Sequence, residues 1–282
     1  MNTLKGKKIL ICRPRQESIP LEQKLNTAGA EVCFFPTFRI EMVPVGDPQI
    51  TWSLLRDISS FDWVILSSGN GVTALKYFLS QASVSESQLS RVSVGVVGKK
   101  TAARVEKNFP GIRPKAIEKD VQTLINNISQ HFVKTTGRVL HPTSLQSIEK
   151  LSLNIPENVE LIRLPLYRTV LNDEFTPEQV EQILATNFDL ILFSSPTSFD
   201  YFRKFLKDEK ILYETNIMSF GKTTARYIES MGYPVAVIPS SPEPAIMTKA
   251  IQDFFHQKTV MKLNGRIEQD FLTNQKGDID TL

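Results

Sequence analysis

The stretch FDLILFSSPTSFDYFRKFL at residues 188–206 decides the fold, because FDWVILSSGNGVTALKYFL at residues 61–79 repeats its pattern. Each stretch begins with Phe-Asp, continues as a short apolar run, and reaches two serines before a segment of helical periodicity. GKKTAAR from Gly98 and GKTTARY from Gly221 form a second repeated pair in the same order. The two copies lie roughly 125 residues apart, which indicates an internal duplication.

Short apolar segments alternate with helical patterns along most of the chain. ILIC at 9–12, WVIL at 63–66 and LILF at 190–193 are continuous apolar runs without the polar–apolar alternation of a half-exposed strand. Strands that are covered by helices on both faces carry this pattern, so the fold class is predicted to be α/β, with two similar flavodoxin-like domains built on parallel sheets. A further strand is expected at PVAVI, residues 234–238, before a last helix over 243–255.

Two proline-marked segments, PTFR from Pro36 and PLYR from Pro165, form a third repeated pair and are typical of linkers. If the chain crosses between domains at both segments, the domains are interleaved in sequence. The predicted arrangement is a discontinuous domain of residues 1–35 and 170–259, a second domain of residues 38–165, and a two-stranded linker of residues 36–37 and 166–169 that sets the angle of a cleft. Residues 260–282 are expected to form a flexible tail.

The composition disfavours several classes of protein. The 282 residues carry 33 Lys and Arg against 30 Asp and Glu, a net charge of only +3, so no nucleic-acid-binding face is expected. Cys12 and Cys33 are too few for a disulfide framework, and no Cys/His spacing suggests a metal site. The N-terminal apolar run is too short for a signal peptide, and no segment approaches the roughly 18 apolar residues of a membrane span. We therefore expect a cytoplasmic protein that binds neither nucleic acid nor membrane.

In an open parallel sheet, ligands bind beyond the carboxyl ends of the strands, where helices begin. Ser68 and Ser195 lie at such junctions, and Pro196 is a favourable first helical residue. The segments Gly98 to Thr101 and Gly221 to Thr224 form a second pair of helix starts. Because the free N–H groups of a helix start attract anions, these four starts predict a cleft site for a negatively charged ligand.

Each of these residues also has a purely structural interpretation. A serine at a helix start stabilises its own helix by about 1 kcal/mol wherever it occurs, and glycine permits a tight turn. The presence of both polar helix starts in both copies favours a ligand. The sequence has neither GxGxxG after its first strand nor GxxxxGK[ST], which disfavours dinucleotides and nucleoside triphosphates. A carboxylate-bearing ligand is therefore favoured, phosphate is the alternative, and no cofactor is expected.

Several short motifs, in order, resemble those of the uroporphyrinogen-III synthase family over roughly residues 7–255. They are ICRPR (11–15), LSSGNGV (66–72), VVGKKTA (96–102), LYRT (166–169), FSSPTSF (193–199), FGKTTA (220–225) and PSSPEP (239–244). The two interleaved α/β domains of that family, joined by a β-ladder linker, agree with the arrangement argued from the repeats.

The resemblance implies a cofactor-free lyase of tetrapyrrole synthesis that cyclises linear hydroxymethylbilane, a polycarboxylate, to uroporphyrinogen III. Water leaves from the terminal hydroxymethyl group, and the azafulvene cation on ring A is attacked at the substituted carbon of ring D. The spiro intermediate then breaks and closes again with ring D inverted. Because the substrate also closes spontaneously without inversion, the protein is expected chiefly to hold one reactive conformation.

The resemblance also implies roles for particular residues. Tyr167 matches the family tyrosine proposed to assist the departure of water, and Phe38 stands at its position in the other copy. The acetate and propionate groups are expected to meet cleft-lining residues from both copies: Arg13, Ser67, Ser68, Asn70, Gly98, Lys99, Thr101, Ser194, Ser195, Pro196, Gly221, Thr223 and Thr224. Lys99 and Lys222 have an alternative interpretation as solvated residues at helix starts.

The segment GRVLHPTSLQSIEKL from Gly137 departs from the family, which often has a glycine and arginines after this strand. His141, which stands there instead, is either a local substitute or without a role.

We expect a monomer that receives its linear tetrapyrrole from hydroxymethylbilane synthase. Two alternatives remain. One is a non-catalytic two-domain sensor that binds an anionic metabolite in the cleft; the presence of Tyr167 disfavours it. The other is a flavodoxin-like or nucleotide-dependent enzyme, which the absence of a phosphate loop disfavours.

Overall fold

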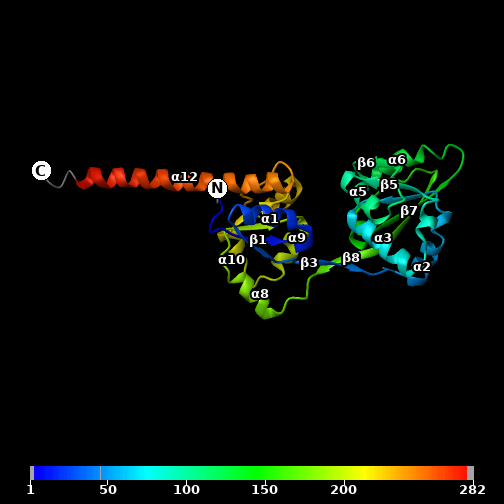
Figure 1. The fold of residues 1–282 in the computed structure, drawn as a ribbon, viewed down its shortest axis with the longest axis horizontal. Coiled ribbons are helices and arrows are strands. Elements are labelled where there is room, and N and C mark those ends of the chain that lie inside the picture. Colours follow the sequence, from blue (N-terminus) through cyan, green and yellow to red (C-terminus); the bar gives the residue numbers. More distant parts are fainter. Residues whose placement is uncertain (1–2, 45, 278–282) are drawn as a thin grey trace. The chain divides into compact units, whose positions relative to one another are not determined.

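The computed structural model describes residues 3–44 and 46–277, with side chains as far as residue 260. Figure 1 follows the chain through its helices and strands. By its internal contacts the chain divides into two compact units: unit 1 consists of Met1–Arg39 and Leu171–Leu282, and unit 2 of Ile40–Val170. Both boundaries fall within strands, namely β3 (Phe38–Met42) and β8 (Val159–Leu171).

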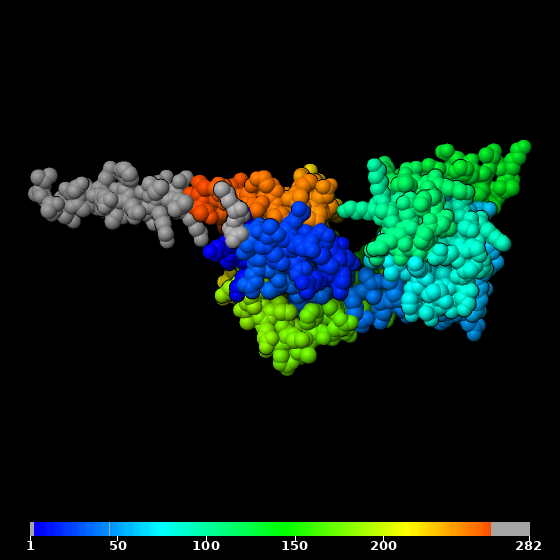
Figure 2. All heavy atoms as spheres, in the orientation of Figure 1, coloured from blue at the N-terminus to red at the C-terminus, as the bar shows by residue number. Residues whose placement is uncertain are grey.

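Unit 1 is built on a four-stranded parallel sheet with the order β10-β9-β1-β2. Its strands are β1 (Lys8–Cys12), β2 (Glu31–Phe34), β9 (Leu190–Phe193) and β10 (Asn216–Ser219). Its helices are α1 (Ile19–Thr27), α8 (Pro177–Leu184), α9 (Pro196–Arg203), α10 (Lys210–Glu214), α11 (Lys222–Ser230) and α12 (Pro244–Gly277), with a 3-10 turn at Arg15–Glu17. The N-terminal segment lies against α12, where Gln252 Nε2 donates to Thr3 Oγ1 at 2.8 Å (Figure 2).

Successive residues of a unit 1 strand enter different cores. Leu190 and Leu192 of β9 pack with α1 and α12, whereas Ile191 and Phe193 pack with α9, α10 and α11. Because helices cover both faces of the sheet, every position along the strand is apolar, which is why the sequence shows no alternation there. The prediction of an α/β fold with parallel sheets is confirmed.

Unit 2 is built on a six-stranded sheet with the order β3-β8-β7-β4-β5-β6, whose pairs from β8 to β6 are parallel. Its further strands are β4 (Trp63–Leu66), β5 (Ser93–Val97), β6 (Ala116–Glu118) and β7 (Gly137–Ser144). Its helices are α2 (Pro48–Arg56), α3 (Gly69–Gln81), α4 (Glu86–Leu89), α5 (Lys99–Asn108), α6 (Val121–Ser129) and α7 (Leu145–Lys150), with a 3-10 turn at Ile58–Ser60. Helices α3 and α5 pack on one face around Leu66 and Leu140, and α6 packs on the other around Ile65 and Val139.

The two sheets repeat one strand order. The sequence β5-β4-β7-β8 in unit 2 corresponds to β10-β9-β1-β2 in unit 1. The register gives equivalent positions, because Val139 pairs with Trp63 as Ile9 pairs with Leu190. Along the chain, however, the pair β4–β5 precedes β7–β8, whereas β1–β2 precede β9–β10. The two copies are therefore circular permutations of one another, which supports the duplication read from the sequence.

The prediction of a strand at PVAVI, residues 234–238, is wrong in its extent. In the structure this segment contributes a single bridge, between Met218 and Val237, at the sheet position where unit 2 has the three-residue β6. Ala236 N and Val237 N both donate to Ile217 O, so the pairing does not advance along the strand. Pro234 opens the segment and has no N–H to donate, which also prevents a longer ladder.

The last helix is longer than predicted. It was expected over residues 243–255, whereas α12 runs from Pro244 to Gly277. Part of the segment predicted as a flexible tail is thus helical in its backbone. Residues 278–282 of that segment lie outside the described residues.

Candidate active site

The carboxyl end of β4 leads through Ser67 and Ser68 directly into α3. Ser68 is the N-cap in an extended conformation (φ −154°, ψ 158°), and its Oγ accepts a hydrogen bond from Gly71 N at 3.0 Å. Ser195 has nearly the same geometry at the start of α9 (φ −159°, ψ 161°), where its Oγ accepts from Ser198 N at 3.1 Å. Both serines therefore cap their helices, as expected for a purely structural role.

Tyr167 lies on β8 next to the start of α3. Its side chain is 6% exposed, and its hydroxyl is 2.9 Å from Ser68 Oγ. Ser144, at the end of β7, is its neighbour in register across the two strands. Burial raises the pKa of Tyr167 above its ordinary value, and the neighbouring hydroxyls of Ser68 and Ser144 act to lower it. At neutral pH the side chain is thus a phenol with a proton to donate.

A β-bulge brings Tyr167 to this position. Thr143 pairs with Pro165, but Ser144 pairs with Tyr167, so the strand has one extra residue, Leu166. Leu166 and Tyr167 consequently both enter the same core, although they are adjacent in a strand. Bulges often redirect a side chain beside an active site, and this one places the tyrosine hydroxyl against the α3 cap.

His141 on β7 contacts the other serine of the pair. Its Nε2 is 3.0 Å from Ser67 Oγ, the ring is fully buried, and its Nδ1 has no hydrogen-bond partner among the described residues. Burial and the nearby charge of Arg163 lower the pKa of His141 to about 3, so it is neutral at physiological pH. The equivalent position in unit 1 is the fully buried Ile11. The sequence left the role of His141 open, and the structure places it beside a predicted site residue.

Arg163, next to His141 in register, was missed by the sequence reasoning. Its Nη1 donates to Leu151 O at 3.0 Å and its Nη2 to Ser147 O at 2.5 Å, which fastens α7 to β8. Burial lowers the pKa of this guanidinium. The available signal was an arginine inside the apolar run ELIRL, residues 160–164.

The start of α5 carries the remaining site residues predicted in unit 2. Gly98 is its N-cap with φ 77°, Thr101 is buried, and Lys99 is exposed. The exposure of Lys99 leaves both of its interpretations open. Arg104 further along α5 donates to Thr73 Oγ1 of α3 at 3.0 Å, which ties the two helices together near their starts. Asn70, in the first turn of α3, is partly buried.

The other predicted residues lie in unit 1, at the carboxyl edge of its own sheet: Arg13, Ser194, Ser195, Pro196, Gly221, Thr223 and Thr224. Arg13 Nε donates to Glu17 Oε2 at 2.7 Å, and its guanidinium lies 5.6 Å from the ring centroid of Phe220. Thr224 is buried, whereas Thr223 and Lys222 are exposed. The structure thus gathers the site residues into two groups, one in each unit.

The two groups share a framework but differ in chemistry. Tyr227 of α11 donates to Asp200 of α9 at 2.7 Å, at the positions equivalent to Arg104 and Thr73 of unit 2. The residue equivalent to Tyr167 is Phe38, which has no hydroxyl. Only the unit 2 group therefore places a phenol against the capping serine.

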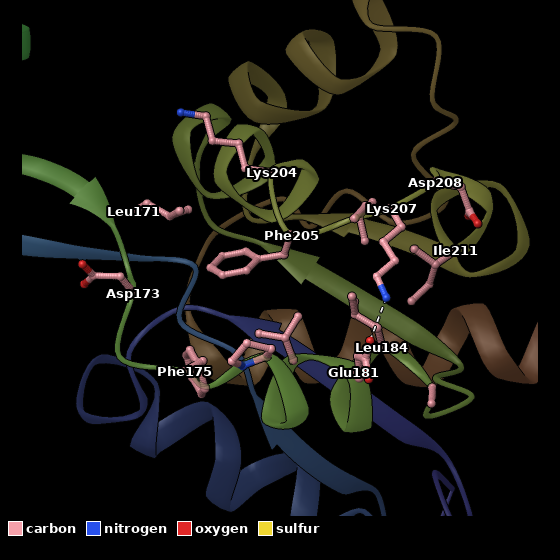
Figure 3. A pocket seen from close by; sticks show the side chains of 14 residues that line it. Leu171, Asp173, Phe175, Glu181, Leu184, Lys204, Phe205, Lys207, Asp208 and Ile211 are labelled. Atoms are coloured by element: carbon pink, nitrogen blue, oxygen red, sulfur yellow. Dashed lines mark hydrogen bonds and ion pairs between the residues drawn. The ribbon is translucent and has the colours of Figure 1, made fainter.

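A pocket of about 740 Å³ lies in unit 1 (Figure 3). Phe175 and Phe205 line it, and at its rim Lys207 Nζ forms an ion pair with Glu181 Oε1 at 2.7 Å. None of the predicted site residues is among those lining it. Its size suits a small ligand, but no predicted site residue lines it, and Lys207 and Glu181 are paired with each other, so we assign it no part in the chemistry.

The part of the chain that the structure describes offers neither a metal site nor a membrane span. No group of three or more His, Cys, Asp or Glu side chains there could hold a metal ion. None of the helices there combines the length and the apolar character needed to cross a bilayer.

Comparison with known proteins gives the site a context. Residues 19–249 match the family described as uroporphyrinogen-III synthase HemD. The chain is 27% identical to the uroporphyrinogen-III synthase of Chlorobaculum parvum over 251 residues, which is 88% of this chain and 98% of that one. It is 24% identical over 205 residues, 72% of its length, to the porphyrin biosynthesis protein HemD of Ruminiclostridium josui, of which it spans only 40%. A solved structure of a uroporphyrinogen III synthase variant from Thermus thermophilus shares the fold, with a TM-score of 0.59, 16% identity, and coverage of 89% of this chain and 100% of that one.

Proposed function

The chain belongs to the uroporphyrinogen-III synthase family, a family of lyases, and we propose that it cyclises hydroxymethylbilane to uroporphyrinogen III with Tyr167 as the proton donor. The observation that carries this assignment is the 2.9 Å contact between the Tyr167 hydroxyl and Ser68 Oγ at the start of α3. It places a protonated phenol at the edge of the sheet where ligands of parallel α/β folds bind.

The first step removes the terminal hydroxyl of the substrate as water. Tyr167 gives its proton to that oxygen while the carbon–oxygen bond breaks and its electron pair stays with the oxygen. The electron-rich pyrrole carries the resulting positive charge, so a weak acid is sufficient. After ring D has been attacked, released and closed in inverted orientation, the macrocycle loses one proton. That proton restores the phenol, so the cycle needs no cofactor.

The two groups of helix starts hold the substrate carboxylates. Backbone N–H groups at the starts of α3 and α9, and the hydroxyls of Thr101 and Thr224 at the starts of α5 and α11, suit acetate and propionate groups. Holding the flexible chain in one reactive conformation contributes most to the rate, in favourable cases about 7 to 11 kcal/mol. Each unit has its own cores and its own group, which supports interleaved domains that each bind part of the substrate.

The instability of the substrate supports a direct transfer from the enzyme that makes it. Because hydroxymethylbilane closes by itself, direct transfer from hydroxymethylbilane synthase to a monomeric cytoplasmic enzyme would avoid loss to the uninverted product. Its two cysteines, with Cys12 buried, agree with a reducing compartment.

One assay tests the assignment. The purified chain is incubated with hydroxymethylbilane, the products are oxidised, and isomers III and I are separated, with heat-denatured protein as the control. We expect isomer III to dominate with the native protein and isomer I with the control. Formation of isomer I alone with native protein would overturn the enzymatic assignment and favour a sensor that binds an anionic metabolite.

A further inference from the structure

Two helix-capping serines lie beside Tyr167, one at the start of α3 and one on the neighbouring strand. Ser68 caps α3, and its Oγ accepts from Gly71 N at 3.0 Å. Ser144 caps α7, and its Oγ accepts from Ser147 N at 3.1 Å. Ser68 Oγ is 2.9 Å from the tyrosine hydroxyl, and Ser144 on the neighbouring strand β7 is paired with Tyr167 in register.

The capping bonds favour one direction for the hydroxyl protons. A serine hydroxyl has one proton and two lone pairs, and in both serines a backbone N–H already occupies an acceptor position. A hydroxyl that accepts a hydrogen bond becomes a stronger donor in its other one. Each serine is therefore disposed to donate to the oxygen of Tyr167, which has two lone pairs to receive them. The proton of Tyr167 itself then remains available for a ligand.

We propose that Ser68 and Ser144 are positioning residues that turn the Tyr167 proton outward and stabilise the phenolate left after that proton is given away. The proposal rests on the proposed role of Tyr167 as the acid, and it assigns Ser68 a task different from carboxylate binding. No covalent step is added, because the serines keep their protons and only share them with the phenolate oxygen.

The second copy of the fold shows that the caps alone do not require this arrangement. In unit 1, Ser195 also caps its helix, but its hydrogen bonds are reciprocal with Ser198. Ser195 Oγ accepts from Ser198 N, and Ser198 Oγ accepts from Ser195 N, both at 3.1 Å. The position equivalent to Tyr167 is Phe38, and the position equivalent to Ser144 is Pro14. The same helix start thus forms without the other two hydroxyls, so those hydroxyls are additions specific to unit 2.

The electrostatic surroundings of Tyr167 agree with this proposal. Burial raises its pKa, and the two serine hydroxyls oppose that effect. The titratable side chains on the strands beside it are Arg138 and His141 on β7, Glu160, Arg163 and Arg168 on β8, and Arg39 and Glu41 on β3. His141 is neutral, Arg138 pairs with Glu160, and Glu41 pairs with Arg168. Burial raises the pKa of the phenol and the serines lower it, so removing a serine should raise the pKa of Tyr167 further.

The test is a titration of Tyr167 that needs no substrate. The full chain is labelled with ¹³C at the ζ carbon of its 6 tyrosines, the Tyr167 signal is assigned with Tyr167→Phe, and its pKa is followed between about pH 8 and pH 12. We expect Ser68→Ala and Ser144→Ala each to raise the pKa by about one unit, and the double variant to raise it further. Ser68→Thr and Ser144→Thr keep a hydroxyl and should restore a value near that of the wild type.

Asp120→Ala is the matched control, because Asp120 caps α6 of the same unit through Thr123 N at 2.7 Å and should leave the Tyr167 signal unchanged. If an alanine variant does not fold, Ser68→Gly and Ser144→Gly replace it, since glycine costs an N-cap only a few tenths of a kcal/mol. An unchanged or lowered pKa in the double variant would overturn the proposal. The titration is independent of isomer III formation, so failure of the proposed function and failure of this proposal are separate results.

Discussion

At the scale of single residues, the most unusual feature is a histidine buried where the other copy has an isoleucine. His141 occupies the core position of Ile11 and has Ser67 Oγ as its hydrogen-bond partner at 3.0 Å. Burying a polar ring costs free energy unless it is hydrogen-bonded, and one of its nitrogens has no partner among the described residues. The ring is therefore better explained by holding Ser67 than by packing.

This burial makes stability depend on pH. The pKa of His141 is about 3 in the folded protein, against an ordinary 6.5, so between these values the unfolded chain binds a proton that the folded chain does not. Stability should fall as pH is lowered through that window, by up to roughly 5 kcal/mol in all. Above pH 6.5 the histidine contributes no such penalty.

His141→Ile should remove this dependence. Between pH 7 and pH 4.5 the wild type should lose about 2 to 3 kcal/mol more free energy of unfolding than the variant, measured by urea denaturation at both pH values. His131→Gln, which replaces an exposed histidine of unit 2, is the control and should lose as much as the wild type. Equal losses in wild type and His141→Ile would show that protonation of His141 is not coupled to unfolding.

Tyr167→Phe tests the phenol itself. Loss of the proton donor should lower kcat for isomer III by at least about tenfold, with a smaller change in KM, because packing of the ring is kept. Isomer I should rise in proportion, since unprocessed substrate closes spontaneously. Tyr77→Phe, at an exposed tyrosine of α3, should leave the isomer ratio unchanged. An unaltered ratio in Tyr167→Phe would remove the tyrosine from the mechanism.

At the scale of elements, the repeated glycines show that like sequences need not have like backbones. Gly98 before α5 has φ 77° and ψ 153°, a conformation reserved for glycine, whereas Gly221 before α11 is extended at φ −174°. A Cβ would meet no atom within 4 Å at either position. Any difference between their alanine variants must therefore come from backbone strain.

Gly98→Ala should cost about 1 to 3 kcal/mol of stability, and Gly221→Ala less than about 0.5 kcal/mol. Urea denaturation of the two variants under identical conditions measures the difference, and each serves as the control for the other. Losses of equal size would mean that the conformation of Gly98 relaxes without cost.

Elements also show where sequence reasoning stops. Apolar runs and capping serines follow local rules, so strands β4 and β9 and the starts of α3 and α9 were predictable. The pairing of Ser144 with Tyr167 depends on the bulge at Leu166. No local pattern in PLYR predicts that β8 has an extra residue there. Similarly, His141 meets Ser67 only because β7 lies beside β4, a long-range choice of strand order.

At the scale of the whole molecule, the duplicated sequence is matched by a duplicated strand order. The motifs at 61–79 and 188–206 indicated two copies, and the sheets repeat one order of four strands. The domain division predicted at 36–37 and 166–169 is close to where the chain divides by its contacts, at 39–40 and 170–171, and whether the units act as separate domains stays a prediction. The motifs could reveal the copies because each is a local strand–helix junction, whereas boundaries depend on contacts between distant segments.

The separate cores lead to a last prediction about cooperativity. Each hydrophobic cluster draws its residues from one unit only, with Leu140 in unit 2 and Leu192 in unit 1, and both side chains are fully buried. Leu140→Ala and Leu192→Ala should each cost about 2 to 5 kcal/mol in the unit that contains them, through lost burial and the cavity left behind. Hydrogen exchange followed by mass spectrometry should then show faster exchange in β4 and β7 for the first variant and in β9 and β1 for the second. The unsubstituted unit of each variant is the internal control, and faster exchange throughout both units would mean that they unfold as one cooperative body.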